Sequence, residues 1–233
     1  MPHANPTHEA AICDVLSAAR SSTYIRAAGG DKAKAMELYG WNARVSAAFM
    51  LPSHFAEVAT RNAVAEALES VYGSNWPWDR TFEESVPAPA GKNYNPRRDL
   101  QQTRSKQPTT GKVIAELKFA FWQAMFTARH DVRVWNHQIL TLFPHSSGMT
   151  ASQLRGKIYV DLEAVRKLRN RVAHHEPIFT RNLSSDLKRM LQLVELRSAP
   201  THTWLRAMEE VTVTLSQRPV PNQRQRVTAS TTT

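Results

Sequence analysis

Apolar residues recur every three or four positions through most of this chain, and this spacing restricts the possible folds more than any other feature. Between residues 154 and 173, Ile158, Leu162, Val165 and Val172 fall on one face of a helix turning about 100° per residue. Valine and isoleucine do not gather into the alternating runs that predict strands, and the chain has only 8 glycines. The pattern predicts an all-α fold.

The same periodicity, broken by proline, glycine and polar clusters, divides the chain into expected helices. The helices are expected at 9–20, at 31–40 with Asp31 as the N-terminal cap, at 41–72 with a kink or two abutting helices at Pro52, at 113–140, from about 150 to 173, and near 182–197 and 201–216. We expect them to form one domain over residues 1–216.

Residues 83–112 differ in composition from the rest of the domain. Proline, asparagine, glutamine and basic residues dominate, which predicts a long basic loop. Its cations Arg97, Arg98, Arg104 and Lys106 are candidates for binding RNA phosphates, and a solvated linker is the alternative interpretation. The basic, proline-bearing tail at 217–233 is expected to be disordered.

The charge balance favours a polyanionic partner. Lysine and arginine exceed aspartate and glutamate by 30 to 20, so the net charge is +10, although ordinary enzymes also carry solvated basic faces. Cys13 is the only cysteine, which excludes an intramolecular disulfide and a cysteine-based zinc site. No signal-peptide pattern and no apolar run of membrane-spanning length occurs, so we expect a cytoplasmic protein without a membrane partner.

Arg169 interrupts the apolar face of the helix expected at 154–173. Because arginine is almost never buried alone, the position requires an anionic partner, an opening to solvent or a second chain. A matching interruption is Asn62, on the apolar face of the expected helix 51–68, and we expect Asn62 to approach Arg169. Glu57 and Arg61 stand one helical turn apart and are expected to pair. For Asn62 and Glu57, a purely structural hydrogen bond is the alternative.

The same helix ends in two histidines. Pro177 disfavours helical geometry at the preceding residue, so the helix should end at about His174 or His175. An imidazole can transfer protons near neutral pH, and a nearby guanidinium can stabilise charge on phosphate. Together, Arg169 and His174 have the groups needed to cleave RNA without a metal.

The spacing of this pair is not specific by itself, since chance gives roughly one such pair in a chain of this composition. Five residues also place Arg169 and His174 roughly 140° apart around an ideal helix. They converge only if the helix end unwinds or if a second copy of the chain contributes. The significance therefore depends on the surrounding sequence.

That surrounding sequence, "LRNRVAHHEPIF", resembles the signature of the Abi-like (abortive infection) proteins, a branch of the HEPN superfamily. The segments "YIRAAGGDKAKAMELYGWNARVSAAF", "HFAEVATRNAVAEAL", "YGSNWPW" and "VIAELKFAFWQAMF" resemble Abi-like segments in the same order. Together these cover about residues 24–180.

The resemblance implies a HEPN-type helical bundle with additional flanking helices, and ribonuclease activity at Arg169, Asn170 and His174. It implies a homodimer, because two copies of the motif form one composite site in HEPN enzymes, and a role in phage defence or as a toxin. His175 is expected to support or replace His174, and Glu176 to satisfy the helix end or to pair with a basic group. RNA is the expected partner, and no cofactor is expected.

Two other functions are compatible with the sequence. A non-catalytic HEPN module that binds RNA or protein would use the same net charge and the same basic segment. A metal hydrolase built on His174, His175 and Glu176 is disfavoured, because adjacent histidines point in different directions on a helix and the i, i+4 spacing of a helical zinc pair is absent.

Overall fold

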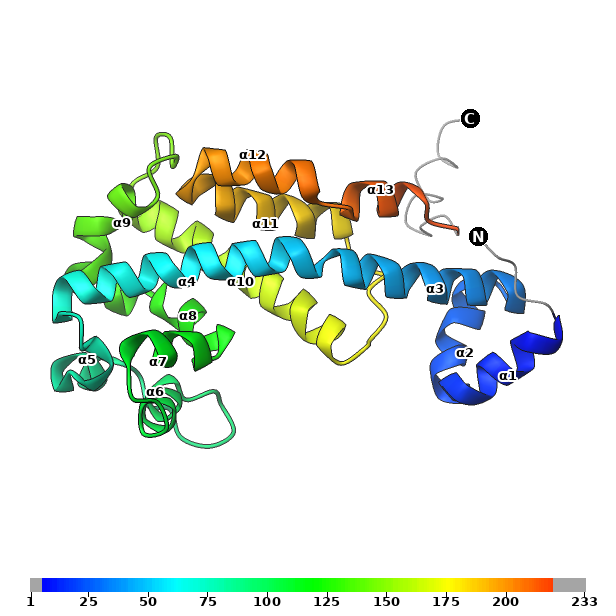
Figure 1. The fold of residues 1–233 in the computed structure, drawn as a ribbon, viewed down its shortest axis with the longest axis horizontal. Coiled ribbons are helices and arrows are strands. Elements are labelled where there is room, and N and C mark those ends of the chain that lie inside the picture. Colours follow the sequence, from blue (N-terminus) through cyan, green and yellow to red (C-terminus); the bar gives the residue numbers. More distant parts are fainter. Residues whose placement is uncertain (1–5, 220–233) are drawn as a thin grey trace, which may run out of the picture. The chain divides into compact units, whose positions relative to one another are not determined.

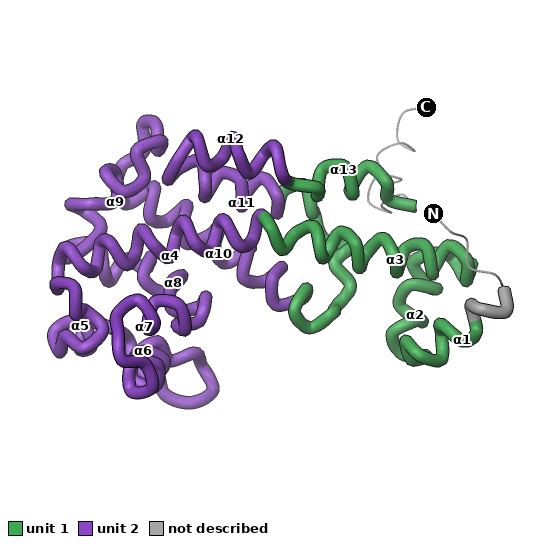
Figure 2. The backbone as a smooth tube through the Cα atoms, in the orientation of Figure 1, with its two compact units in different colours: residues 1–51, 171–185, 209–233 green, residues 52–170, 186–208 purple. Residues whose placement is uncertain are grey.

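The computed structural model describes residues 6–219, with side chains from Ala10 onward. Within these residues every regular element is a helix and no strand occurs, which confirms the all-α prediction (Figure 1). The chain divides into two compact units, coloured separately in Figure 2. Unit 1 comprises 1–51, 171–185 and 209–233, and unit 2 comprises 52–170 and 186–208. The HEPN-type bundle and the single domain stay predictions.

Unit 1 is built on the helix α3, against which α2 and α13 pack. Its helices are α1 (Pro6–Leu16), α2 (Ala18–Ala27), α3 (Lys32–Ala48) and α13 (Val211–Ser216), and it also holds the end of α10 (Ala151–Ala173). The buried indole of Trp41 donates its Nε1 proton to the carbonyl of Thr214 at 2.7 Å, and Arg218 lies over the same ring. This pairing fixes α13 on α3.

Unit 2 contains the larger part of the chain. Its regular elements are α4 (Met50–Tyr72, from Pro52 onward), the 3₁₀ turn η1 (Trp76–Trp78), α5 (Arg80–Ser85), α6 (Pro96–Arg104), α7 (Thr110–Glu116), α8 (Phe119–Met125), the turns η2 (Ala128–His130) and η3 (Asp131–Trp135), α9 (Asn136–Leu142), α10 up to Asn170, α11 (Leu183–Arg197, from Asp186 onward) and α12 (Ala199–Met208).

Aromatic side chains form much of the core of unit 2. The expectation that Phe119, Phe121 and Trp122 are core residues is confirmed, because all three are buried. The rings of Phe126 and Trp135 stack with centroids 4.6 Å apart, and Trp135 Nε1 donates to the carbonyl of Met125 at 2.7 Å. These contacts account for the short turns there, since the helix expected at 113–140 is divided so that its large rings can reach the core.

The starts of α3 and α4 follow from single residues that the sequence analysis singled out, Asp31 and Pro52. Asp31 accepts a hydrogen bond from the Lys34 N–H at 3.0 Å and starts α3, as expected. Pro52 lies in the first turn of α4, where a missing N–H does no harm, so two successive helices cover 32–72. The expected helix at 9–20 is instead interrupted at Ser17, whose φ of 71° ends α1.

The prediction of a long loop over 83–112 is wrong. The segment contains α6 and the first turn of α7, and the longest irregular stretch lies before Pro96. The Asn95 side chain accepts from the Arg98 N–H at 2.9 Å, and Pro96 occupies the first helical position. Thr109 likewise caps α7. The composition hid two capped helices, because asparagine, proline and threonine are the residues that begin helices.

The tail predicted to be disordered lies largely outside the described residues, from 220 onward. Among the described residues, none of the helices combines the length and apolar character needed to span a membrane.

Candidate functional site

The C-terminal end of α10 carries the histidine motif, and main-chain hydrogen bonds fix its shape. The Glu176 N–H donates to the carbonyl of Arg171 at 2.8 Å, and the His175 N–H donates to that of Val172 at 3.0 Å. These are the two bonds of a Schellman cap, in which the residue after the cap adopts a left-handed conformation. His175 has that conformation, with φ of 54°, where glycine is usual. The helix therefore ends at Ala173, with His174 as its cap residue.

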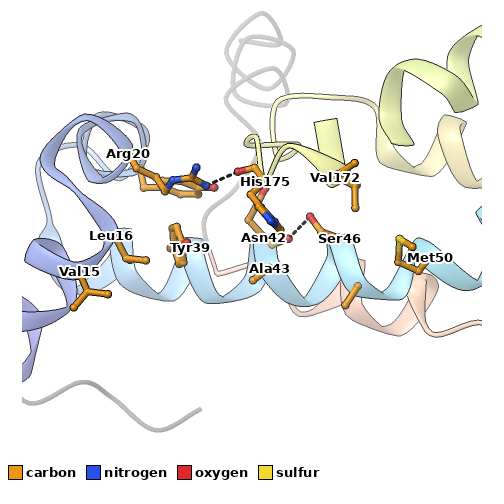
Figure 3. A pocket seen from close by; sticks show the side chains of 13 residues that line it. Val15, Leu16, Arg20, Tyr39, Asn42, Ala43, Ser46, Met50, Val172 and His175 are labelled. Carbon is orange, nitrogen blue, oxygen red and sulfur yellow. Dashed lines mark hydrogen bonds between the residues drawn. The ribbon is translucent and has the colours of Figure 1, made fainter. Parts of the chain in front are cut away.

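Two arginines brace this turn within unit 1. Arg20 of α2 donates from Nη1 to the His175 carbonyl at 2.6 Å (Figure 3). Arg171 pairs with the Glu176 carboxylate, with Nε and Oε2 3.3 Å apart. Glu176 thus contacts the helix terminus through its N–H and a basic side chain through its carboxylate. The left-handed residue, which costs about 1 kcal/mol for a side chain other than glycine, is held by these contacts.

The chain after the turn is anchored by a residue that sequence reasoning missed. Asn42 of α3 is only 6% exposed, and its Oδ1 accepts the Ile178 N–H at 2.9 Å. Ile178 and Phe179 are buried directly after Pro177. The available signal was a polar residue inside the apolar stretch around Trp41, because a buried amide must find a partner.

The two histidines differ in their surroundings. Both are exposed, and His175 lines a pocket of unit 1 that His174 does not line. The expected catalytic histidine is therefore displayed to solvent by the cap.

Arg169 lies in the part of α10 that belongs to unit 2, and its side chain is 44% exposed. Its Nε is 3.4 Å from Glu57 Oε2, and its guanidinium lies over the Phe119 ring, 5.8 Å from the centroid. Of the three expected solutions for this arginine, an anionic partner and an opening to solvent are both present. The neighbouring residue Asn170 is exposed.

The side chain of Arg169 reaches solvent from within the apolar arc of α10. Leu168 is fully buried, whereas Arg169 reaches the surface although its Cα falls within the apolar arc. A long arginine side chain can cover apolar surface with its methylene groups while its charged end reaches water. This agrees with the opening to solvent that was one of the three expected solutions.

The predicted contacts between Glu57 and Arg61 and between Asn62 and Arg169 are wrong. Glu57 pairs with Arg169 and not with Arg61, whose Nε is buried without a hydrogen-bond partner among the described residues. Asn62 is exposed and lines another cavity, of about 480 Å³, together with Phe55 and residues of α11. Because Glu57 and Asn62 are roughly 140° apart on α4, Asn62 faces away from Arg169.

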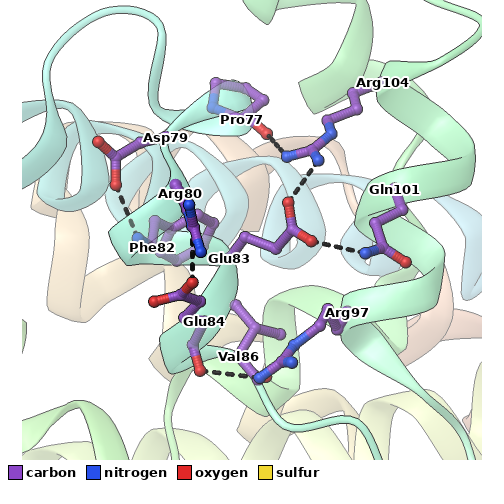
Figure 4. Close-up of polar contacts among 10 residues, drawn as sticks. All are labelled: Pro77, Asp79, Arg80, Phe82, Glu83, Glu84, Val86, Arg97, Gln101 and Arg104. Atoms are coloured by element: carbon purple, nitrogen blue, oxygen red, sulfur yellow. Dashed lines mark hydrogen bonds and ion pairs between the residues drawn. The ribbon is translucent and has the colours of Figure 1, made fainter.

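Two arginines of α6, Arg97 and Arg104, bind other parts of the protein itself (Figure 4). Arg104 donates to the Pro77 carbonyl at 2.8 Å and pairs with Glu83, and both charged side chains are 20% exposed. Arg97 donates to the carbonyls of Val86 at 2.9 Å and Glu84 at 2.8 Å. These guanidinium groups tie α5 and the following loop to α6.

The two other cations of this segment, Arg98 and Lys106, are exposed. Glu83 also accepts a hydrogen bond from Gln101 at 2.6 Å. This bond, together with the hydrogen bond and the charge of Arg104, lowers the pKa of the Glu83 carboxyl below its ordinary value. The basic segment therefore divides into two structural arginines and two solvent-exposed cations.

Among the described residues, no group of three or more histidine, cysteine, aspartate or glutamate side chains is placed to hold a metal ion. A scan against protein-family models, a search of curated proteins and a search of solved structures each found no match.

Proposed function

We propose that this chain is a metal-independent endoribonuclease of the HEPN type, acting on RNA in the cytoplasm as a homodimer. The observation that carries the proposal is the exposure of the motif: Arg169, Asn170 and His174 each present polar side chains to solvent in their own unit. Side chains that served only the core would be buried and saturated with partners.

The reaction follows from these groups. One imidazole accepts the proton of the RNA 2′-hydroxyl as its oxygen bonds to phosphorus, and the bond from phosphorus to the 5′-oxygen breaks. A second imidazole supplies the proton that the leaving 5′-oxygen takes up. Arg169 stabilises the negative charge on the phosphoryl oxygens. The products are a 2′,3′-cyclic phosphate and a 5′-hydroxyl, and DNA is inert because it lacks the nucleophile.

A homodimer supplies the second imidazole. The angular separation of Arg169 and His174 on one helix disfavours their meeting on one phosphate, whereas two helix ends related by a two-fold axis can face the same phosphate. A role in phage defence or as a toxin rests on the sequence resemblance alone.

The test is cleavage of RNA by the purified protein in EDTA, with the cut ends mapped chemically. His174→Ala and Arg169→Ala should each lower cleavage by about 10²-fold or more. His137→Ala and Arg206→Ala, which remove exposed residues of the same types outside the motif and the basic segment, should leave it unchanged. A substrate with 2′-deoxyribose at the cut site should stay intact. RNA that binds in a salt-dependent way but is never cut would instead favour the non-catalytic module.

A further inference from the structure

A pocket of about 660 Å³ lies within unit 1, lined by residues of α1, α2, α3 and the end of α10 (Figure 3). This volume falls in the range of about 300–1,000 Å³ that is typical of small-molecule sites. Most of the wall is apolar, with Leu16, Ala43, Ala47 and Val172 among its residues. The polar groups include Arg20, Tyr39 and His175.

The apolar wall is unusually open to solvent. Val15 is 87% exposed and Met50 is 56% exposed, although both line the pocket. Ala43 and Ala47 are exposed as well. Contiguous apolar surface around a concave site is a common mark of ligand binding.

The charge of the pocket has one sign. Arg20 is its permanent cation, and no acidic side chain is among the described residues that line it. One guanidinium nitrogen, Nη1, is used by the His175 carbonyl. Because a guanidinium has five N–H donors, the others can bind an anion in a surrounding that is otherwise apolar.

We propose that this pocket binds a small amphipathic anion, in which a carboxylate or similar head group meets Arg20 and an apolar body covers the wall formed by Leu16, Ala43 and Val172. A ligand of this kind explains why Arg20, which has no carboxylate partner among the described side chains, stands beside exposed apolar side chains. The site goes beyond the proposed ribonuclease activity, since its binding requires no RNA and no catalytic residue.

Ligand binding at Arg20 would also affect the turn that follows α10. The same guanidinium holds the carbonyl of His175, the residue with left-handed geometry. An anion bound to the remaining donors draws the guanidinium towards itself, and so changes how firmly the turn after α10 is braced.

The experiment uses 8-anilinonaphthalene-1-sulfonate, an apolar anion that fluoresces in dry surroundings, as the probe on the full-length protein. Decanoate, kept below its micelle-forming concentration, should displace it, and decanol, which has the same chain without the charge, should displace it about tenfold less well. Arg20→Gln should remove that difference. Arg26→Gln, an exposed arginine on the same helix that does not line the pocket, should retain it.

A second variant tests the location by filling the pocket. Ala43→Trp places a large side chain on the exposed face of α3 and should abolish saturable probe binding, with an unchanged circular dichroism spectrum and melting temperature. Equal displacement by decanoate and decanol in the unaltered protein, or unchanged binding in both Arg20→Gln and Ala43→Trp, would overturn the proposal. Probe binding that disappears as the protein dimerises would also overturn it, because a second copy would then cover the pocket.

Discussion

The arginines of α6 and the arginine near the end of α10 look alike in the sequence and differ in how the fold uses them. Arg97 and Arg104 donate to main-chain carbonyls of their own unit, and the Arg104–Glu83 pair is largely shielded. Among the described residues Arg169 has one ion pair, the longer one with Glu57, and its side chain is nearly half exposed. The comparison shows that local basicity is a poor guide to ligand binding, because the number of satisfied donors separates structural arginines from available ones.

The largest expected effect concerns catalysis. Arg169→Ala should lower the rate of RNA cleavage by about 10²–10³-fold, since it removes the group that stabilises the phosphoryl charge. The measurement is a single-turnover rate on a defined RNA. Arg206→Ala, which removes an exposed arginine of α12, is the matched control. An equal loss in both variants would mean that Arg169 has no role beyond that of any exposed arginine.

The next effect is a pH dependence of stability, which extends the comparison to histidines. Burial, with a smaller contribution from the neighbouring Arg129 charge, lowers the pKa of His130 from 6.5 to about 4, and this side chain is only 3% exposed. The unfolded chain binds the proton more tightly, so the stabilisation is complete above pH 6.5 and is lost as the pH falls towards 4. The loss should reach roughly 3 kcal/mol.

Urea unfolding at several pH values measures this loss, and His130→Leu supplies a chain without the titrating group. The variant should lose less stability between pH 6.5 and 4 than the unaltered protein. If the free energy of unfolding fell equally with pH in both proteins, groups other than His130 would cause the acid sensitivity.

A smaller effect is expected for the structural arginine. Arg104→Ala leaves Glu83 and the Pro77 carbonyl partly shielded from solvent and without this partner. The free energy of unfolding should therefore fall by about 2 kcal/mol. RNA cleavage at a temperature well below the melting point should not change. A lost activity in a fully folded Arg104→Ala protein would place this arginine among the RNA-binding residues.

The smallest expected effect is a gain in stability. His175→Gly should stabilise the protein by about 0.5–1 kcal/mol, because glycine adopts the left-handed conformation without the steric cost. Thermal unfolding measures the gain. Cleavage that persists in this variant assigns the proton transfer to His174, and cleavage that disappears assigns a part of it to His175.

The sequence predicted those parts of the fold that depend on one local interaction. Asp31 starts α3 because its side chain accepts a hydrogen bond from the N–H three residues later. The apolar period over 154–173 predicted a helix, and α10 ends within one residue of the predicted end. Asn95 and Pro96 gave an equally local signal, which the basic composition around them concealed.

The features that could not be predicted depend on residues distant in sequence. Glu57 meets Arg169 only because α4 and α10 are packed in one register, and no local pattern specifies that register. The anchoring of Ile178 by Asn42 joins residues 136 positions apart. The motif could be located from the sequence, and its structural supports could not.

The cap after α10 has a consequence for variation at position 174. Main-chain hydrogen bonds, Arg20 and Arg171 hold the turn, so the end of α10 does not depend on the imidazole of His174. The chemical group displayed there can therefore be exchanged for a carboxylate, an amide or a thiol while the scaffold stays as it is. A helix closed by its own backbone leaves that one site open to redesign.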